Sequence, residues 1–162
     1  MAVNIKKVIP HQRYFNGKYK LKNPEKYIGD PSEIIFRSSY ERRFCVFCDF
    51  DSSVIKWSSE PYSIPYKNPL TGKNSEYFVD FYARIKNAYG EEVDYLIEVK
   101  PRKKLNKPIA PQRDTLKKLE NYNREMTEYV INLSKFSAAK AFALKIGYKF
   151  IVVTEEELYA KS

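Results

Sequence analysis

Two neighbouring segments decide the fold of this chain: YFVDFY at residues 77–82 and YLIEVK at residues 95–100. Both are short runs of aromatic and β-branched residues, which predicts β-strands. Successive side chains of a strand point to opposite faces, so Glu98 and Lys100 are expected on the same face of a sheet. If the adjoining strand brings Asp80 beside them, two carboxylates and one ammonium group meet at one point.

These three side chains have the chemistry needed to hydrolyse a phosphodiester. Carboxylate oxygens bind Mg²⁺, and a lysine beside the metal positions or deprotonates a water molecule. The alternative is an ordinary solvated strand face, since 30% of the residues are charged and a lone E-x-K motif has little specificity. The context favours the metal site, because Asp80 lies in an aromatic segment and basic residues follow Lys100.

The composition predicts a globular chain rather than a disordered or membrane-spanning one. Its 162 residues are enough to bury a core without disulfide bonds, and 43% of them are hydrophobic and 15% aromatic. No apolar run approaches the ~20 residues needed to cross a bilayer, and the polar amino terminus lacks the apolar core of a signal peptide. We therefore expect a protein of a reducing cytoplasm that makes no membrane contact.

The two cysteines, Cys45 and Cys48, form a C-x-x-C motif that has no second pair. A structural zinc site normally needs four ligands, and the one histidine, His11, is distant in the sequence. The cysteines lie at helical spacing among phenylalanines, which favours small core side chains over a redox or metal role.

The net charge of +9 predicts a nucleic-acid partner. A basic surface gains affinity for phosphates by releasing counterions, without reading base sequence. One basic group lies near the amino terminus, at Lys6, Lys7, Arg13, Lys18, Lys20 and Lys22. The candidate DNA contacts form a second group after the predicted metal site, at Arg102, Lys103, Lys104, Lys107 and Arg113, with Lys135 as a further candidate. Charge runs are often merely solvated, but the position of the second group favours DNA over a membrane.

The order of predicted elements indicates an α/β domain with a mixed sheet flanked by helices. Residues 1–35 lack clear periodicity and are interpreted as a basic, tyrosine-containing arm, and the domain spans residues 36–162. We expect helices at 39–50, 112–123, 129–146 and 155–159, and strands at 54–57, 62–66, 76–85, 91–100 and 148–154. Leu116 and Leu119 are expected to be buried, and Gly147 is expected to end a helix in the left-handed conformation.

Glu41 has two interpretations. Ser38-Ser39-Tyr40-Glu41 is a capping box, in which the Glu41 carboxylate reaches back to the backbone N–H of Ser38. The same carboxylate is a candidate for the metal site, and the residues of this segment alone fit either role.

The order of the acidic residues bears on this choice. A glutamate on an early helix, an aspartate on a strand and E-x-K on the next strand resemble the pattern of the PD-(D/E)xK nuclease superfamily. The residues that fit this pattern are Glu41, Asp80, Glu98 and Lys100. One departure is Val79, which precedes the aspartate where the superfamily pattern has proline and leaves the ligand itself in place.

The resemblance narrows to one branch of that superfamily. The segments RSSYE at 37–41, IKWSSEP at 55–61, YFVDF at 77–81 and KFSAA at 135–139, with the ending at 147–158, are similar to TnsA-like endonucleases. Within this branch, the compact size and the basic amino-terminal region resemble the head completion nucleases of large tailed bacteriophages.

The resemblance implies a restriction-endonuclease-like core and a Mg²⁺-dependent DNA endonuclease, in which Mn²⁺ would substitute. Asp80, Glu98 and the backbone carbonyl of Val99 would hold the metal. Glu41 would act on a metal-bound water or a second ion, and Lys100 would orient the attacking water.

The biological task implied for such a protein is to process packaged DNA ends in late head assembly. This work would take place in the host cytoplasm or on the virion, with capsid or portal proteins as further partners. Two alternatives stay open: a virion assembly protein that uses the nuclease fold as a scaffold, and a transposition, restriction or repair endonuclease. The first predicts that biological activity survives the loss of Asp80, and the second predicts a discrete preference in the DNA that is cut.

Overall fold

Four strands form the central sheet of this structure, a computed structural model that describes residues 16–113 and 115–160. The strand order is β3 (Val54–Ser59), β6 (Phe81–Lys86), β7 (Glu92–Val99) and β8 (Lys149–Val153). β3, β6 and β7 pair in antiparallel fashion, whereas β7 and β8 run parallel. The sheet is therefore mixed, and the predicted α/β fold is confirmed.

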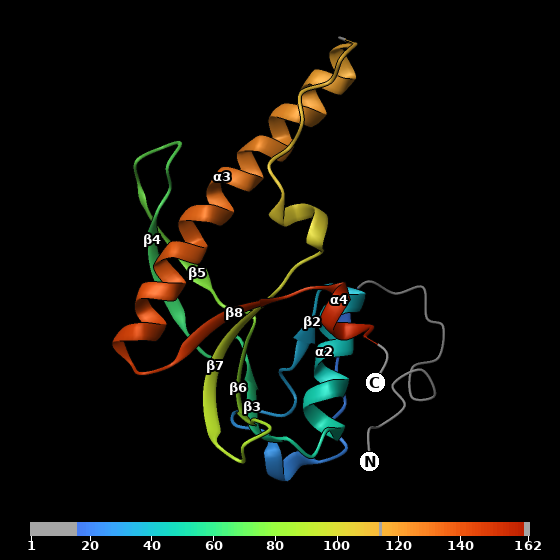
Figure 1. Ribbon diagram of the computed structural model, residues 1–162, viewed down its shortest axis with the longest axis vertical. Coiled ribbons are helices and arrows are strands. Elements are labelled where there is room, and N and C mark those ends of the chain that lie inside the picture. Colours follow the sequence, from blue (N-terminus) through green and yellow to red (C-terminus); the bar gives the residue numbers. More distant parts are fainter. Residues whose placement is uncertain (1–15, 114, 161–162) are drawn as a thin grey trace.

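Other elements cover both faces of this sheet (Figure 1). On one face lie α2 (Ser39–Phe50) and α4 (Glu155–Leu158). The other face carries α3 (Leu116–Lys145) and the hairpin of β4 (Ser63–Lys67) and β5 (Asn74–Phe78). The short elements are β1 (Gly17–Lys18), β2 (Ile35–Phe36) and the 3₁₀ turns η1 (Pro24–Lys26) and η2 (Arg102–Leu105). Among the described residues, no helix, the 30-residue α3 included, combines the length and apolarity needed to span a membrane.

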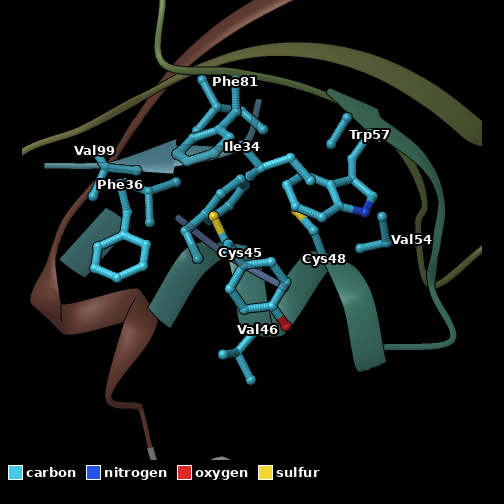
Figure 2. Packing of buried hydrophobic residues seen from close by; sticks show 14 of the residues in the cluster. Ile34, Phe36, Cys45, Val46, Cys48, Val54, Trp57, Phe81 and Val99 are labelled. Atoms are coloured by element: carbon cyan, nitrogen blue, oxygen red, sulfur yellow. The ribbon is translucent and has the colours of Figure 1, made fainter. Parts of the chain in front are cut away.

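The core under α2 is built from alternate residues of the strands and one stripe of the helix. Figure 2 shows Cys45 and Cys48 of α2 among the side chains of Ile34, Trp57 and Phe81. Both cysteines are free thiols and fully buried, and burial raises their pKa well above the ordinary value. Their predicted role as small core residues is confirmed.

The predicted strand at 76–85 is wrong as a single element, because it divides at Val79 and Asp80. β5 pairs only with β4, whereas β6 enters the central sheet. At the break, Val79 is fully buried and the Asp80 carbonyl accepts a hydrogen bond of 2.8 Å from the Glu60 N–H. The Asp80 carbonyl is thus bound outside the strand ladders, and the Asp80 side chain bonds the Val99 N–H at the end of β7.

The two helices predicted at 112–123 and 129–146 are one helix, α3. Residues 124–128 contain neither glycine nor proline, so nothing in the chain interrupts the helical hydrogen bonds there. The first half of α3 extends away from the sheet beside the segment that precedes it (Figure 1). Leu116 and Leu119 lie in this half and are 76% and 38% exposed, so the expectation that they are buried was wrong. The expected left-handed residue after the helix is confirmed at Gly147, with φ 78°.

Residues 16–35 pack on the rest of the domain through one buried carboxylate. Asp49 of α2 is 1% exposed and accepts hydrogen bonds from the Tyr19 hydroxyl (2.8 Å), the Lys22 N–H (2.9 Å) and the Asn23 N–H (2.8 Å). Ile34 is fully buried in the same core. A separate arm at 1–35 stays a prediction, and Lys6, Lys7, His11 and Arg13 lie outside the described residues.

We expect Asp49→Ala to lower the free energy of unfolding by about 3 kcal/mol, because three donors lose their acceptor in a buried site. For a chain of this size the melting temperature should fall by roughly 6–12 °C. The matched control is Asp30→Ala, which removes an exposed carboxylate bonded to Ser32 and should change stability little. Equal melting temperatures for the two variants would show that Asp49 does not anchor residues 16–35.

Candidate active site

Asp80 lies in the gap between β5 and β6 and faces the end of β7. Its Oδ2 atom accepts a hydrogen bond of 2.8 Å from the backbone N–H of Val99. Burial raises the pKa of Asp80 well above its ordinary value, and the nearby charge of Glu98 raises it further. The structure therefore brings the Asp80 and Glu98 carboxylates together. They meet because Asp80 bonds the end of β7, and not because the two residues lie on adjacent strands.

Glu98 and Lys100 lie on the same face, as predicted from their spacing. Glu98 is 3% exposed, and its Oε1 atom is 3.1 Å from the Nζ atom of Lys100. Burial tends to lower the pKa of Lys100, but the charge and hydrogen bond of Glu98, together with Asp80, raise it above its ordinary value. A half-buried ammonium group is thus held in its charged form against two carboxylates.

Glu41 makes a capping contact at the start of α2. The Ser38 side chain accepts a hydrogen bond from the Glu41 N–H (3.0 Å), and the Glu41 Oε2 atom accepts one from the Arg37 N–H (2.7 Å). The capping box predicted the Ser38 N–H as the donor to the Glu41 carboxylate, whereas the structure has the N–H of the preceding residue, Arg37. Burial raises the pKa of Glu41, the Arg37 contacts lower it, and the charge of Glu98 raises it. Glu41 is therefore within electrostatic reach of Glu98, and its action on a metal stays a prediction.

The side chains that could bind a metal are carboxylates. Across residues 16–113 and 115–160, no group of three or more His, Cys, Asp or Glu side chains is placed to hold an ion. Asp80 and Glu98 form a pair of hard oxygen donors at the end of β7, a donor set that suits Mg²⁺ or Mn²⁺ rather than a thiolate-binding metal. A cation would also offset the repulsion between these two buried carboxylates.

Comparisons with known proteins identify the family of this chain. The family model of the TnsA-like endonuclease N-terminal domain matches residues 51–155. The chain belongs to this family. It is also 36% identical over 146 residues to the head completion nuclease of Enterobacteria phage T4, covering 90% of this chain and 95% of that protein. No solved structure matches the chain.

The basic residues that follow β7 in this TnsA-like endonuclease differ in their partners. The Arg102 N–H donates a hydrogen bond to the Glu155 carboxylate, and the Arg102 guanidinium forms an ion pair with Glu156. Lys104 forms an ion pair of 2.8 Å with Glu128. Lys103, Lys107 and Arg113 are exposed. The ammonium group of Lys135 lies 5.6 Å from the ring centroids of both Tyr66 and Tyr77. The structure thus places these candidate DNA contacts near η2 and α3, and their role in binding DNA stays a prediction.

Sequence reasoning missed two contributors to the site of this TnsA-like endonuclease. Glu60 has a positive φ of 47°, which is uncommon for a residue with a side chain, and it forms an ion pair with Arg37. The Tyr77 hydroxyl donates a hydrogen bond of 2.5 Å to Glu98 Oε2. A signal for Tyr77 was available, because a buried tyrosine hydroxyl needs a partner and this residue stands three positions before Asp80. No local pattern indicated the conformation of Glu60, which precedes a proline.

Proposed function

We propose that this protein is a divalent-metal-dependent DNA endonuclease that serves as a phage head completion nuclease, acting on DNA in late head assembly after packaging. The observation that carries this proposal is the meeting of Asp80, Glu98 and Lys100 at the end of β7. Membership of an endonuclease family supports the chemistry, and the similarity to a head completion nuclease supports the biological setting. The setting would be the host cytoplasm during assembly, with capsid or portal proteins as partners.

Asp80, Glu98 and the backbone carbonyl of Val99 would hold Mg²⁺, with Mn²⁺ as a substitute. Glu41, near Glu98, would act through a water molecule or a second ion. When bound, the cation neutralises the charge that develops on the phosphate oxygens. The support for this site is geometric: Asp80 bonds the Val99 N–H directly beside Glu98, so two carboxylates and the Val99 backbone meet at the end of β7.

Lys100 would orient the water that attacks phosphorus. Its ammonium group is held by Glu98 on the face that carries the carboxylates, so a water molecule bonded to it would lie beside the phosphate. In-line attack forms a bond from the water oxygen to phosphorus and breaks the bond to the leaving 3′ oxygen. The products are a 5′-phosphate and a 3′-hydroxyl.

The DNA would be held by its phosphates rather than read by its bases. Lys103 and Lys107 are exposed on the segment after β7, and Arg102, Lys104, Arg113 and Lys135 would add contacts. We expect the double variant Lys103→Ala/Lys107→Ala to reduce the slope of log K against log salt by about 1.8, or about 0.9 per lost phosphate contact.

The matched control for that measurement is Lys86→Ala/Lys149→Ala. These exposed lysines pair with Glu92 and Tyr95 in the first half of β7, away from the end that carries the site. This variant removes the same charge, so its salt slope should stay near that of the wild type. An equal reduction of the slope in both double variants would favour a diffuse charge effect, and an unchanged slope in both would reject a DNA contact at Lys103 and Lys107.

The experiment that tests the function is cleavage of plasmid and linear duplex DNA in Mg²⁺, Mn²⁺ or EDTA, with DNA binding measured at matched salt. We expect cutting in both metals, none in EDTA, and cut sites scattered along long DNA. Binding without cutting in any metal would favour the assembly-scaffold alternative. Cutting at one fixed sequence would favour a restriction or transposition role.

A further inference from the structure

A buried tyrosine holds one of the two carboxylates of the candidate metal site. Tyr77 on β5 is 5% exposed, and its hydroxyl donates a hydrogen bond of 2.5 Å to the Oε2 atom of Glu98. The hydrogen bond joins the β4–β5 hairpin to the central sheet, since Glu98 lies on β7. It is therefore a contact between two layers at the site itself.

The two oxygens of Glu98 have different partners. Oε2 accepts from Tyr77, and Oε1 faces the ammonium group of Lys100 at 3.1 Å. Together these contacts fix the plane of the carboxylate. If Lys100 turns toward a water molecule during the reaction, the Tyr77 hydroxyl is the contact that keeps Glu98 in place.

Neighbouring side chains restrict the ring of Tyr77. Tyr77 pairs with Ile64 across the hairpin, and both side chains are buried in the core beneath α3. The ammonium group of Lys135 on α3 lies 5.6 Å from the centroid of the ring. A side chain held in this way has little freedom to leave Glu98, which is what an orienting group requires.

We propose that Tyr77 is a positioning residue for the metal site: its hydroxyl orients the Glu98 carboxylate for binding a divalent cation. This inference rests on the proposed metal-dependent nuclease function. Ligating carboxylates are commonly hydrogen-bonded to a second group, and loss of that group typically costs 10–100-fold in metal affinity or activity.

The test compares Tyr77→Phe with wild-type protein in two measurements. Mn²⁺ binding is titrated without DNA by electron paramagnetic resonance, and the rate of plasmid cleavage is measured at saturating Mn²⁺. We expect Tyr77→Phe to bind Mn²⁺ about 10-fold more weakly and to cut about 10-fold more slowly. The DNA affinity in EDTA should stay unchanged, because no phosphate contact is removed.

The matched control is Tyr82→Phe. Tyr82 is also buried, and its hydroxyl donates a hydrogen bond of 2.6 Å to a carboxylate, that of Asp94, outside the candidate metal site. Both variants remove the hydroxyl of a buried tyrosine that bonds a carboxylate, although Asp94 is only partly buried, so the melting temperature of Tyr82→Phe should fall by no more than that of Tyr77→Phe. Only Tyr77→Phe should change Mn²⁺ affinity.

The outcomes separate this inference from the function on which it rests. Wild-type binding of Mn²⁺ with equal binding by Tyr77→Phe would overturn the inference alone and leave Tyr77 a structural residue. Equal weakening of Mn²⁺ binding in Tyr77→Phe and Tyr82→Phe would overturn it as well, since the effect would then be one of stability. Wild-type protein that neither binds Mn²⁺ nor cuts DNA would overturn the proposed function and this inference with it.

Discussion

Lys100→Met should lower the rate of DNA cleavage by about 10³-fold while leaving the binding of Mn²⁺ equal to that of wild-type protein or tighter. Methionine keeps much of the length of the side chain but removes the positive charge that lies 3.1 Å from Glu98 Oε1. The water molecule loses its orienting group, which slows the reaction. Glu98 loses a competing cation, which favours the metal. The cleavage rate and the affinity for Mn²⁺ are measured on the same preparation of each protein.

A second lysine provides the control for that experiment. Lys104 also pairs with a carboxylate, at 2.8 Å from Glu128, but this pair lies between η2 and α3. Lys104→Met should weaken DNA binding modestly and leave the cleavage rate of bound DNA within a few-fold of wild type. If Lys100→Met instead cut at nearly the wild-type rate, Lys100 would have no part in positioning the water. If it lost Mn²⁺ binding together with cleavage, its role would be to shape the site.

The parts of the site that the sequence predicted are those governed by local geometry. Glu98 and Lys100 are two residues apart, so any strand places them on one face. The helix that begins after Ser38 was also predicted, because its N-cap serine and the amphipathic pattern that follows are local features of the sequence. The sequence predicted Asp80 beside Glu98 and Lys100 on the assumption of adjacent strands. In the structure Asp80 does lie beside them, although it is outside a strand.

The parts that the sequence did not predict depend on contacts between distant residues. The aromatic pattern of residues 77–82 continues without interruption through the break at Val79, since both hairpin and sheet bury aromatic side chains. Leu116 and Leu119 follow a helical pattern but are exposed, because the first half of α3 extends beyond the sheet (Figure 1). Helical periodicity therefore predicted helical structure here, but it divided one helix into two and predicted the burial of its first half wrongly.

Glu41 shows why one pattern can support two functions. The capping box is local, and the structure has it in modified form, with the carboxylate bonded to the Arg37 N–H. Its electrostatic interaction with Glu98 is long-range and invisible in the sequence. The two roles are compatible in space, because a carboxylate has two oxygens and the cap contact uses one.

Asp80→Asn should abolish cleavage and, in the absence of metal, make the protein more stable at neutral pH. Burial and the charge of Glu98 raise the pKa of Asp80 in the folded state above its value of 3.8 in an unfolded chain. Between these two pKa values the folded state binds more protons than the unfolded state, so the stability of wild-type protein falls as pH rises. Asparagine does not ionise in this pH range, and it keeps an oxygen that accepts the hydrogen bond from the Val99 N–H. The stability of the variant should therefore not fall as pH rises.

The measurement is thermal unfolding in EDTA from pH 4 to pH 9. The melting temperatures of wild type and Asp80→Asn should be similar near pH 4 and diverge as pH rises, with the variant higher by about 3 °C, or about 1 kcal/mol, at pH 8. Added Mg²⁺ should raise the melting temperature of wild-type protein and leave the variant unchanged. The cleavage rate of the variant should fall by at least about 10³-fold, because the loss of a metal ligand removes most of the charge stabilisation of the transition state.

Asp94 on β7 provides a control of opposite sign. Its hydrogen bond from Arg84 lowers its pKa, so Asp94→Asn should lower stability at neutral pH, and this loss should shrink below the unfolded-state pKa and vanish as pH falls through the lowered folded-state pKa. Opposite changes at these two aspartates would show that Asp80 is kept at a cost to stability, as expected for a residue retained for chemistry. A destabilised Asp80→Asn at pH 8 in EDTA would instead mean that its carboxylate is compensated within the protein, and that the site does not require a cation to be ionised.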